Sequence, residues 1–537
     1  MIFDLHGREV AGAAREVAVR YPQPLWAEVD PETWWQATTY VVREALEAGA
    51  VAPERIAGIG ISGLMHAPVL LDASGAAVAP AMLWMDQRCA SHCDALRREA
   101  EALGVRGARG FSTTHTAPKL RWLAETRPEL LARTHQLLLP KDFIRFRLTG
   151  IGGTDAADAG GTGMYDRAAG DWAWEIVRLA GADPRIMPVI RPAWARAGGV
   201  TPQAAAETGL APGTPVAVGG ADTFCTRLGA GPLAPGEVCI YLGTAAWIAM
   251  PSAGETLGAG GDGQAGGATV RPPAGPAGAA ARRGRPHPAG GHGPAGRTAE
   301  AREAPGDGEG TPERARGPEG AALAVRGFGA TSTTGAALRW ARDLLAPQVA
   351  RLVAATPLSG AWSYDALARE AAEVEPGAEG LYFLPHLMGE RGPQADPLAR
   401  GALVGLTLRH GRPQVVRAVL EGTVFQIRRL LEARLGGAPP AGGLVCGGGA
   451  RSALWLQILA DVTRLPLRAP AVVEAGALGA AILGGAAAGV LSMETAQAQM
   501  VRTGARYVPD PERAARYETL YTRYCRLDDL LAPWFRE

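Results

Sequence analysis

Apolar and polar positions change along the chain in short runs that predict strands alternating with helices. A proline opens a run of apolar residues at helical spacing between Trp26 and about Gly49. Short apolar runs typical of strands follow at Ile56–Ser62, Pro68–Asp72 and Met82–Trp84. Helical runs cover Ala90–Leu103 and Lys119–Glu125, and the same rhythm continues to the end of the chain. The pattern predicts the α/β class.

One segment, Pro251–Gly320, breaks this pattern. Its 70 residues hold 29 Gly or Pro, one Leu and one Val, so it contains too little apolar surface to offset its chain entropy. We expect an unstructured insert, in preference to a nucleic-acid-binding arm, because acids soon dilute its basic run. A frame-shifted stretch of GC-rich DNA is a third reading, and the sequence leaves the choice open.

Composition narrows the function classes. The 537 residues suggest two large domains or three smaller ones. The net charge is +1, from 54 Lys+Arg against 53 Asp+Glu. It produces no overall electrostatic field strong enough to bind nucleic acid or an anionic membrane. The six cysteines lack zinc spacing and predict reduced thiols. The N-terminus has no export signal, and the Ala/Gly-rich run 475–493 suits a buried, close-packed helix better than a membrane span. We expect a cytoplasmic protein.

The segment GIGISG matches a dinucleotide-binding glycine pattern at Gly58, Gly60 and Gly63. A phosphate-binding version must open a helix, whose N-terminus then faces the pyrophosphate. Here strand-like residues and a turn follow instead. We therefore interpret the match as incidental and expect nucleotide binding, if present, to use another architecture.

Three other segments run from an apolar strand into a small polar turn. Asp222 follows the strand 216–218 and is either a helix cap or a carboxylate placed to accept a hydroxyl proton. Gly243 and Thr244 suit close approach to phosphate oxygens, although a tight hairpin turn is the favoured explanation when this segment is taken alone. The glycines 447–449 lead into a helix near Ser452 and would either admit a ligand or serve packing.

Side chains suited to a sugar gather after the first strands. Met65 and His66 follow the strand that carries Ser62, although a lone histidine is usually structural. Trp84 and Asp86 could stack on a sugar and bond its hydroxyls, or simply form a strand end with a surface ion pair.

Taken in order, these segments resemble the FGGY carbohydrate kinases, and among them the xylulokinase-like members. The resemblance rests on GIGISGLMHAPVLLD, LWMDQR, PKDFIRFRLTG, VAVGGADTFCTRLGAG, YLGTAAW, GERGPQADPLARGALVGLTLRH, LVCGGGARSALWLQILADVT and EAGALGAAILGGAAAG. It covers nearly the whole chain outside 251–326.

The resemblance implies two actin-like (ribonuclease H-like) domains with a cleft between them. We expect a sugar-binding domain at 1–222, a nucleotide-binding domain at 223–490 that contains the insert, and C-terminal helices at 491–537. Hinges are expected near 222–236 and 474–489. A homodimer is left open.

The resemblance also implies phosphorylation of a sugar hydroxyl by ATP with Mg²⁺, D-xylulose being the best single guess. Asp222 is implied as the general base, and the pair Met65 and His66, with Trp84 and Asp86, as substrate contacts. The implied nucleotide contacts are Gly243, Thr244, Gly448, Gly449 and Ala450. No metal ligand is identified.

Three departures keep alternatives open. The family has a first strand and an Asp-x-Gly-Thr/Ser phosphate loop ahead of the segment matched by MIFDLHGREV, which here opens the chain. We expect a start codon assigned too late, and otherwise an inactive sugar- or nucleotide-binding relative whose first domain has a gap in its sheet. The insert is longer than the family's connection. Leu64 replaces a Gln expected beside Met65, so gluconate, ribulose and glycerol also stay open as substrates.

Overall fold

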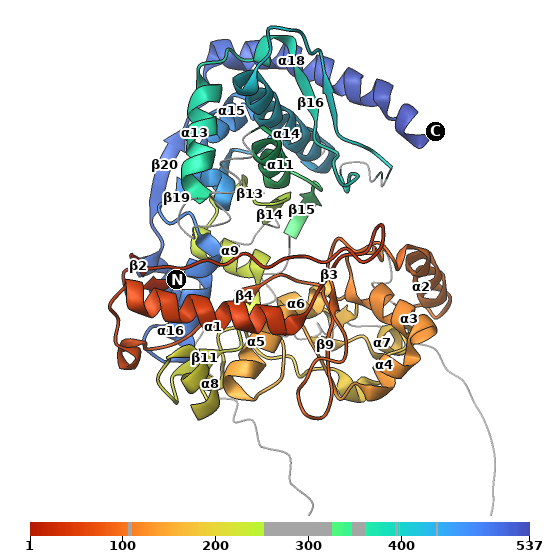
Figure 1. Ribbon diagram of the computed structural model, residues 1–537, viewed down its shortest axis with the longest axis vertical. Helices are drawn as coiled ribbons and strands as arrows, with labels where there is room; N and C mark the ends of the chain where they lie inside the picture. The colour runs from red at the N-terminus through yellow and green to blue at the C-terminus, as the bar shows by residue number, and fades with distance from the viewer. Residues whose placement is uncertain (106–109, 252–324, 346–359, 393–395, 397, 436–438) are drawn as a thin grey trace, which may run out of the picture. The chain divides into compact units, whose positions relative to one another are not determined.

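The computed structural model describes residues 1–105, 110–251, 325–345, 360–392, 396, 398–435 and 439–537. The described residues belong to one compact unit that combines helices with mostly short strands (Figure 1). The α/β class expected from the sequence is confirmed. The predicted insert falls almost wholly on 252–324, outside the described residues.

Residues 1–221 form short strands and eight helices within the ranges described. The helices are α1 (Pro31–Ala48), α2 (Ala90–Ala102), α3 (Thr116–Thr126), α4 (Pro128–Arg133), α5 (Pro140–Thr149), α6 (Ala156–Gly161), α7 (Trp174–Leu179) and α8 (Pro202–Thr208). The strands are β1 (Ile2–Phe3), β2 (Glu9–Ala11), β3 (Glu28–Val29), β4 (Ser62–Gly63), β5 (Val69–Leu71), β6 (Ala81–Met82), β7 (Gln136–Leu138), β8 (Tyr165–Asp166), β9 (Asp171–Trp172), β10 (Arg196–Gly199), β11 (Pro215–Ala217) and β12 (Gly220–Ala221). They pair two by two.

Helix α1 shows how local sequence sets an element in this part. The Asp30 carboxylate accepts the Glu32 amide at 3.0 Å, and Pro31 occupies the first turn, where its missing N–H costs nothing. Trp35 is 2% exposed and belongs to an apolar core with Val69 and Phe143. The proline-started helix expected within the segment from Trp26 to about Gly49 is thus confirmed.

The second half of the chain is built on one mixed sheet of six strands (Figure 1). Its order is β15 (Val325–Ala330), β14 (Ala246–Pro251), β13 (Glu237–Leu242), β18 (Gly442–Cys446), β19 (Leu467–Pro470) and β20 (Thr503–Tyr507). Strands β13, β18 and β19 run parallel, and the other three are antiparallel to their neighbours.

Alternation along β13 buries both faces of this sheet. Val238, Ile240 and Leu242 enter one core, while Cys239 enters another. The first core is shared with α11 (Gly335–Leu345), α13 (Gly360–Ala372), α14 (Arg412–Leu435), α15 (Ala453–Thr463) and α18 (Pro511–Leu531). A hairpin of β16 (Tyr382–Leu384) and β17 (Ala402–Val404) packs against α14.

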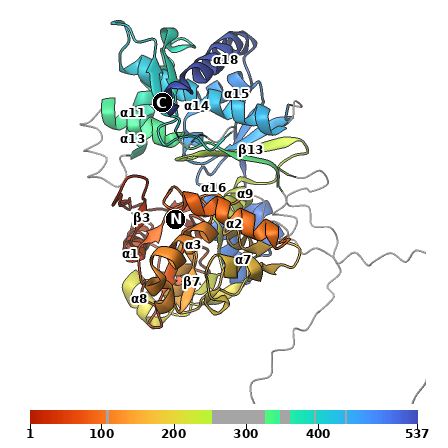
Figure 2. The ribbon, with the colours of Figure 1, turned by 90° about the vertical axis from the view of Figure 1, so that its right-hand side faces the viewer.

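Helices α9 (Asp222–Ala230) and α16 (Ala475–Ala487) lie side by side in both ribbon views (Figures 1 and 2). A Cβ on Gly479 would stand 1.9 Å from the carbonyl oxygen of Cys225, so only glycine permits this approach. The backbone at Gly60 approaches α16 as closely, since its Cβ would lie 1.6 Å from the Ala480 oxygen. The close-packed helix expected in this Ala/Gly-rich run is confirmed, and α17 (Met493–Met500) follows it.

The GIGISG segment opens no helix, as expected. The predicted strand Ile56–Ser62 was too long, because regular pairing is limited to β4, which runs parallel to β12, and to one bridge between Ile59 and Val216. Among the described residues no strand pairs with the other edge of β4. A missing first strand stays a prediction.

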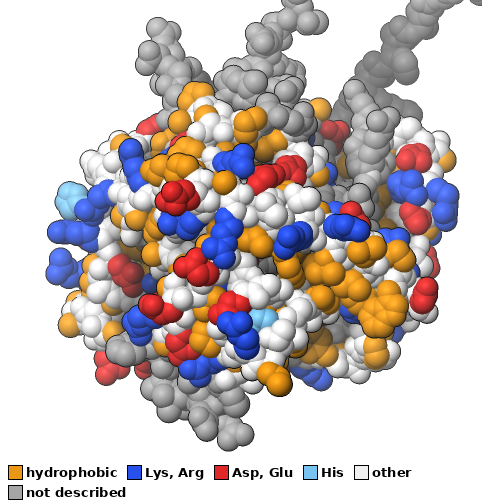
Figure 3. Space-filling view, turned by 90° about the horizontal axis from the view of Figure 1, so that it is seen from above, with side chains coloured by type: hydrophobic (Ala, Val, Ile, Leu, Met, Phe, Trp, Pro, Cys, Tyr) orange, Lys and Arg blue, Asp and Glu red, His pale blue; other side chains and the backbone are white. Residues whose placement is uncertain are grey.

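The state of the cysteines, the surface charge and the character of the helices can be compared with the sequence-based expectations. All six cysteines are free, as predicted. On the face drawn in Figure 3, neither positive nor negative side chains form a continuous area. A search of the helices in the described ranges found none with the length and apolar character needed to cross a membrane.

Candidate active site

Asp222 is the first residue of α9 and comes directly after β12. Its Oδ1 accepts the Thr223 amide at 2.6 Å, so the carboxylate satisfies one free N–H of the first turn, as the capping interpretation expected, although the N-cap position itself is Ala221. Water reaches the carboxylate, yet walls of protein surround it. Burial within those walls raises the pKa of Asp222 to about 6, against the lowering effect of the Thr223 bond. Near neutral pH the group is an ionised base close to its titration range.

A cavity of about 990 Å³ opens beside Asp222. Apolar side chains from the first residues of the chain, from α1 and from the segment 55–64 make up much of its lining. Polar or glycine positions meet it at Thr226, Tyr241, Gly447 and Glu474. The Asp222 carboxylate and Gly447, the first glycine of the turn after β18, therefore reach one cavity, whereas Gly448, Gly449 and Ala450, which were expected under the nucleotide, are not among its lining residues.

Met65 and His66 lie close to α9. The Thr223 hydroxyl donates to the Met65 sulfur at 3.6 Å. A Cβ on Gly161 would stand 2.6 Å from Met65 Cε and 3.0 Å from His66 Cε1, so this glycine makes room for both side chains. The structure thus brings Met65, one member of the expected substrate pair, next to the residue that follows Asp222.

The backbone of His66 adopts a left-handed conformation, with φ at +76°, and polar contacts hold it there. Its carbonyl accepts the Thr116 hydroxyl at 2.9 Å and the Lys119 ammonium at 3.3 Å. Burial and the charge of Lys119 lower the pKa of His66 to about 3, so the ring is neutral at pH 7. Nδ1 lies 2.6 Å from the Gly161 carbonyl, to which it must donate, and Nε2 is left as an acceptor.

Trp84 and Asp86 have different surroundings although they are neighbours in sequence. Trp84 is half-buried and lies beneath the guanidinium of Arg391, whose Cζ is 4.5 Å from the ring centre. Asp86 is fully buried, and its oxygens accept the Ala27 amide at 2.7 Å and three N–H groups of Arg88. Asp86 thus forms the expected ion pair, although the pair is buried and not on the surface, and its contact with substrate stays a prediction.

The turn at Gly243 and Thr244 joins β13 to β14, so it is a hairpin. The carbonyls of this turn hydrogen-bond the segment that leads into α11. Gly243 O accepts the Gly335 amide at 2.8 Å, and Thr244 O accepts the Thr334 amide at 3.0 Å. The side chain of Thr244 is exposed. The hairpin interpretation is correct, and the exposed hydroxyl leaves the phosphate role open.

The glycine turn after β18 combines a crowded residue with an open one. Gly447 has φ at +90°, and its Cβ would stand 2.7 Å from the Leu242 oxygen. Gly448 is exposed, and a Cβ there would meet nothing within 4 Å. Gly449 and the buried Ala450 continue a short 3₁₀ turn that ends at the Ser452 cap of α15. Packing explains Gly447, whereas Gly448 is free to face a ligand.

A buried charge cluster lies behind these strand ends. Lys141 Nζ contacts Asp142 at 2.6 Å, Asp155 at 2.9 Å and Asp158 at 3.0 Å, and all four side chains are at most 2% exposed. The Arg145 guanidinium adds a bond to the Val218 carbonyl at 2.8 Å, just before β12. The cluster ties α5 and α6 to the strand that delivers Asp222.

Two charged residues near the site, Lys119 and Arg391, were not predicted from the sequence pattern. Lys119 is one of only two lysines in an Arg-rich chain, and that rarity was the available signal. It is fully buried, and burial lowers its pKa to about 8. Arg391 lies in the quoted GERGP segment, where its neighbours gave no sign of contact with Trp84.

Comparisons with known proteins agree with this arrangement. The model of the FGGY family of carbohydrate kinases, N-terminal domain, matches residues 1–229, and that of the C-terminal domain matches residues 320–488. The xylulose kinase of Escherichia coli K12 is 29% identical over 536 residues, covering 99% of this chain and 96% of the relative. The glycerol kinase of Gloeobacter violaceus is 30% identical, covering 91% and 86%.

A solved structure extends the match to three dimensions. The xylulose kinase from Rhodospirillum rubrum superposes with a TM-score of 0.66 at 29% identity, covering 97% of this chain and 94% of that one. The family models and the relatives together match the chain over all the segments that carry the expected site residues. The chain belongs to the FGGY family of carbohydrate kinases, which have two actin-like domains and use ATP as a substrate.

Proposed function

We propose that this kinase transfers the γ-phosphoryl group of ATP to a hydroxyl of D-xylulose. The observation that carries the proposal is the Asp222 carboxylate, which borders a large cavity together with Gly447 and is joined through Thr223 to Met65. A pKa of about 6 leaves this carboxylate ionised at pH 7 and still basic enough to take a proton in the transition state.

Each proposed role follows from a position. Met65 and His66 orient the sugar. The neutral His66 ring can accept a hydrogen bond from a sugar hydroxyl at Nε2, and Trp84 offers an apolar face. The exposed Thr244 and the adjacent Gly243 bind phosphate oxygens. Gly448, with Gly449 and Ala450, lies under the adenosine.

Transfer needs positioning more than covalent help from the protein. The sugar oxygen attacks the γ-phosphorus while the bond to the β-phosphate oxygen breaks, and Asp222 takes the hydroxyl proton. The cavity walls around Asp222 limit the water that competes as acceptor.

Mg²⁺ suits this site as an ion carried mainly by ATP. No group of three or more His, Cys, Asp or Glu side chains that could hold a metal occurs within the described ranges. Mg²⁺ is commonly bound by substrate phosphates, water and one or two carboxylates, and Asp222 is an available carboxylate. When bound, the ion would offset charge on the phosphates.

The experiment is a panel of pentuloses, hexonates and polyols, with ADP release measured by a coupled assay. We expect the highest kcat/KM with D-xylulose. A higher value with glycerol or a hexonate would reassign the substrate, and sugar binding without ADP release would indicate an inactive relative. A cytoplasmic location and a homodimer stay predictions.

A further inference from the structure

Arg391 has a half-buried guanidinium with few partners. It follows β16 in the segment 385–392, and its Nη2 donates to the Thr331 carbonyl at 2.9 Å. Its Nε–H is buried and has no hydrogen-bond partner. Within the ranges that the structure describes, no carboxylate forms an ion pair with this guanidinium. Guanidinium has five N–H donors, so most of its capacity is unused.

Arg391 lies between Trp84, a proposed sugar contact, and the segment that bonds the turn at Gly243 and Thr244. Its Cζ lies 4.5 Å from the centre of the Trp84 ring. Burial and the charge of Lys119 lower the pKa of His66, and the charge of Arg391 adds a smaller effect in the same direction. On the other side, Thr331 begins the segment whose Thr334 amide bonds the Thr244 carbonyl.

The backbone that carries Arg391 is held by a single carboxylate. Oε1 of Glu390 accepts the amides of Arg391 at 2.7 Å, Gly392 at 3.1 Å and Ser332 at 3.1 Å. The same carboxylate therefore fixes both the Arg391 segment and the start of the segment that packs on the phosphate turn.

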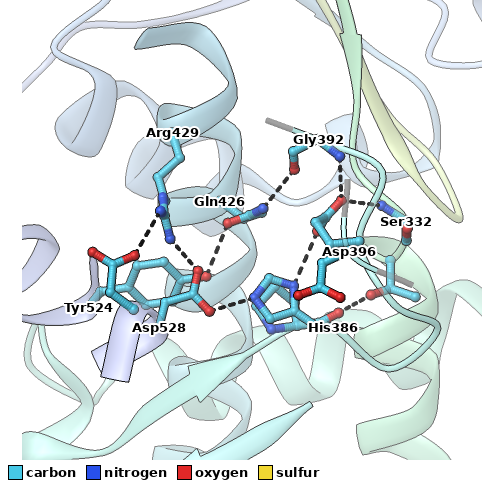
Figure 4. A network of polar contacts seen from close by, with 12 residues as sticks. Ser332, His386, Gly392, Asp396, Gln426, Arg429, Tyr524 and Asp528 are labelled. Carbon is cyan, nitrogen blue, oxygen red and sulfur yellow. Dashed lines mark hydrogen bonds and ion pairs between the residues drawn. The ribbon is translucent and has the colours of Figure 1, made fainter. Parts of the chain in front are cut away.

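A second layer of side chains holds Glu390, and Figure 4 labels its members His386, Gln426, Arg429 and Asp528. His386 Nδ1 lies 3.2 Å from Glu390 Oε2, and its Nε2 lies 2.9 Å from Asp528 Oδ1. Arg429 donates to the other oxygen of Asp528, and Gln426 donates to the Gly392 carbonyl at 2.9 Å. Side chains of α14 and α18 thus brace the loop, which keeps the Arg391 guanidinium in one place.

A purely structural role for Arg391 accounts for only part of this geometry. Stacking on Trp84 would clamp two segments together. A clamp uses only the face of the guanidinium and leaves most of its N–H donors unused. The Nη groups, of which only Nη2 has a hydrogen-bond partner among the described residues, are the donors that an oxygen-rich anion could reach.

We propose that Arg391 is a catalytic residue whose guanidinium donates to the oxygens of the phosphoryl group in transfer. The inference rests on the proposed function. The sugar O–P bond forms as the P–O bond to ADP breaks, ADP leaves with that bond's electron pair, and the hydroxyl proton goes to Asp222. Arg391 keeps its protons throughout and stabilises charge that spreads over the phosphoryl oxygens.

The test compares R391A and R391K with R516A, which removes an exposed arginine of α18 that pairs with Glu375. For R391A we expect kcat to fall by a factor on the order of 10²–10³, the loss typical for one such donor. The KM values for sugar and ATP should change by less than about threefold. ATP hydrolysis without sugar should fall by a similar factor, because that reaction transfers the same group to water.

Two further readouts separate catalysis from folding. Added guanidinium should restore part of the kcat of R391A, and R391K should retain more activity than R391A because it keeps the charge. R516A should match the wild type.

The outcomes divide as follows. A rise in sugar KM at unchanged kcat, or a lowered Tm with unchanged kinetics, would overturn the catalytic role. A wild type that turns over no acceptor overturns the proposed function and this inference with it. A wild type that turns over while R391A keeps its kcat overturns this inference alone.

Discussion

The Thr223 hydroxyl donates to the sulfur of Met65 across 3.6 Å, although the two residues are 158 positions apart. This contact joins α9 to the segment after β4. Because Asp222 precedes Thr223, any sugar that touches Met65 comes close to the carboxylate. The relationship explains how a base and a substrate wall from distant parts of the chain can serve one reaction.

The first prediction concerns Asp222→Asn. The amide keeps the size of the side chain but cannot accept the hydroxyl proton, so ADP release should fall at least about a hundredfold, as expected for loss of a general base. Binding of the sugar, followed by tryptophan fluorescence, should be nearly unchanged. A coupled assay that shows undiminished turnover would refute the role of Asp222 as base.

The second prediction concerns pH and the same residue. A raised folded pKa of about 6 means that kcat should fall as the pH drops below 6. The sign for stability is opposite, because charging Asp222 costs more in the folded than in the unfolded chain. Asp222→Asn should therefore raise Tm at pH 7, and its advantage should shrink between pH 6 and 4. A constant Tm difference over that range would contradict the raised pKa.

The sequence predicted those parts that depend on local rules. Pro31 opens α1, and α15 begins next to Ser452, as expected. The position of Asp222 after an apolar strand also followed from local pattern. Short-range capping and periodicity need no knowledge of distant partners, which is why these elements could be placed.

Contacts between distant segments could not be predicted in that way. One oxygen of Asp86 accepts the Ala27 amide, 59 residues away, a contact that no local pattern indicates. Arg391 and Trp84 come from different halves of the chain and meet in the folded protein. A single sequence records which side chains are available, whereas their partners depend on tertiary packing.

The third prediction compares two glycines of α16. Gly479→Ala should lower the free energy of unfolding by about 3 kcal/mol or more, since its Cβ would stand 1.9 Å from the Cys225 oxygen and overpacking is costly. Gly485→Ala is the matched control, because a Cβ there meets nothing within 4 Å and alanine favours a helix by up to about 1 kcal/mol. Urea unfolding of both variants checks the order. Equal stabilities would mean that α9 and α16 are not packed this closely.

The fourth prediction concerns His386 and alkaline pH. Burial alone would lower the pKa of His386, but hydrogen bonds to Asp528 and Glu390 raise it to about 9. The charged groups around it are those two carboxylates and Arg429, which pairs with Asp528, and burial raises the pKa of the nearby Tyr524 hydroxyl. The stabilisation is full below pH 6.5 and is lost as the pH rises through 9.

Relative to His386→Gln, the wild type should thus lose on the order of 3 kcal/mol of unfolding free energy between pH 6.5 and 9.5, the value of a shift from 6.5 to 9. Chemical unfolding at several pH values measures this difference. A gap between the two proteins that stays constant over that range would show that the imidazole is not held as a cation.

The last prediction separates a packing glycine from a ligand-facing one in the turn after β18. Gly448→Ala should fold normally, because the added methyl meets no atom within 4 Å, yet it should raise the KM for ATP roughly tenfold by crowding the adenosine, as overpacking by one group costs about 1–3 kcal/mol. Gly447→Ala is the comparison, since its φ of +90° and the Leu242 oxygen at 2.7 Å should reduce Tm instead. If Gly448→Ala leaves the KM for ATP unchanged while its Tm also stays constant, the nucleotide does not lie over this turn.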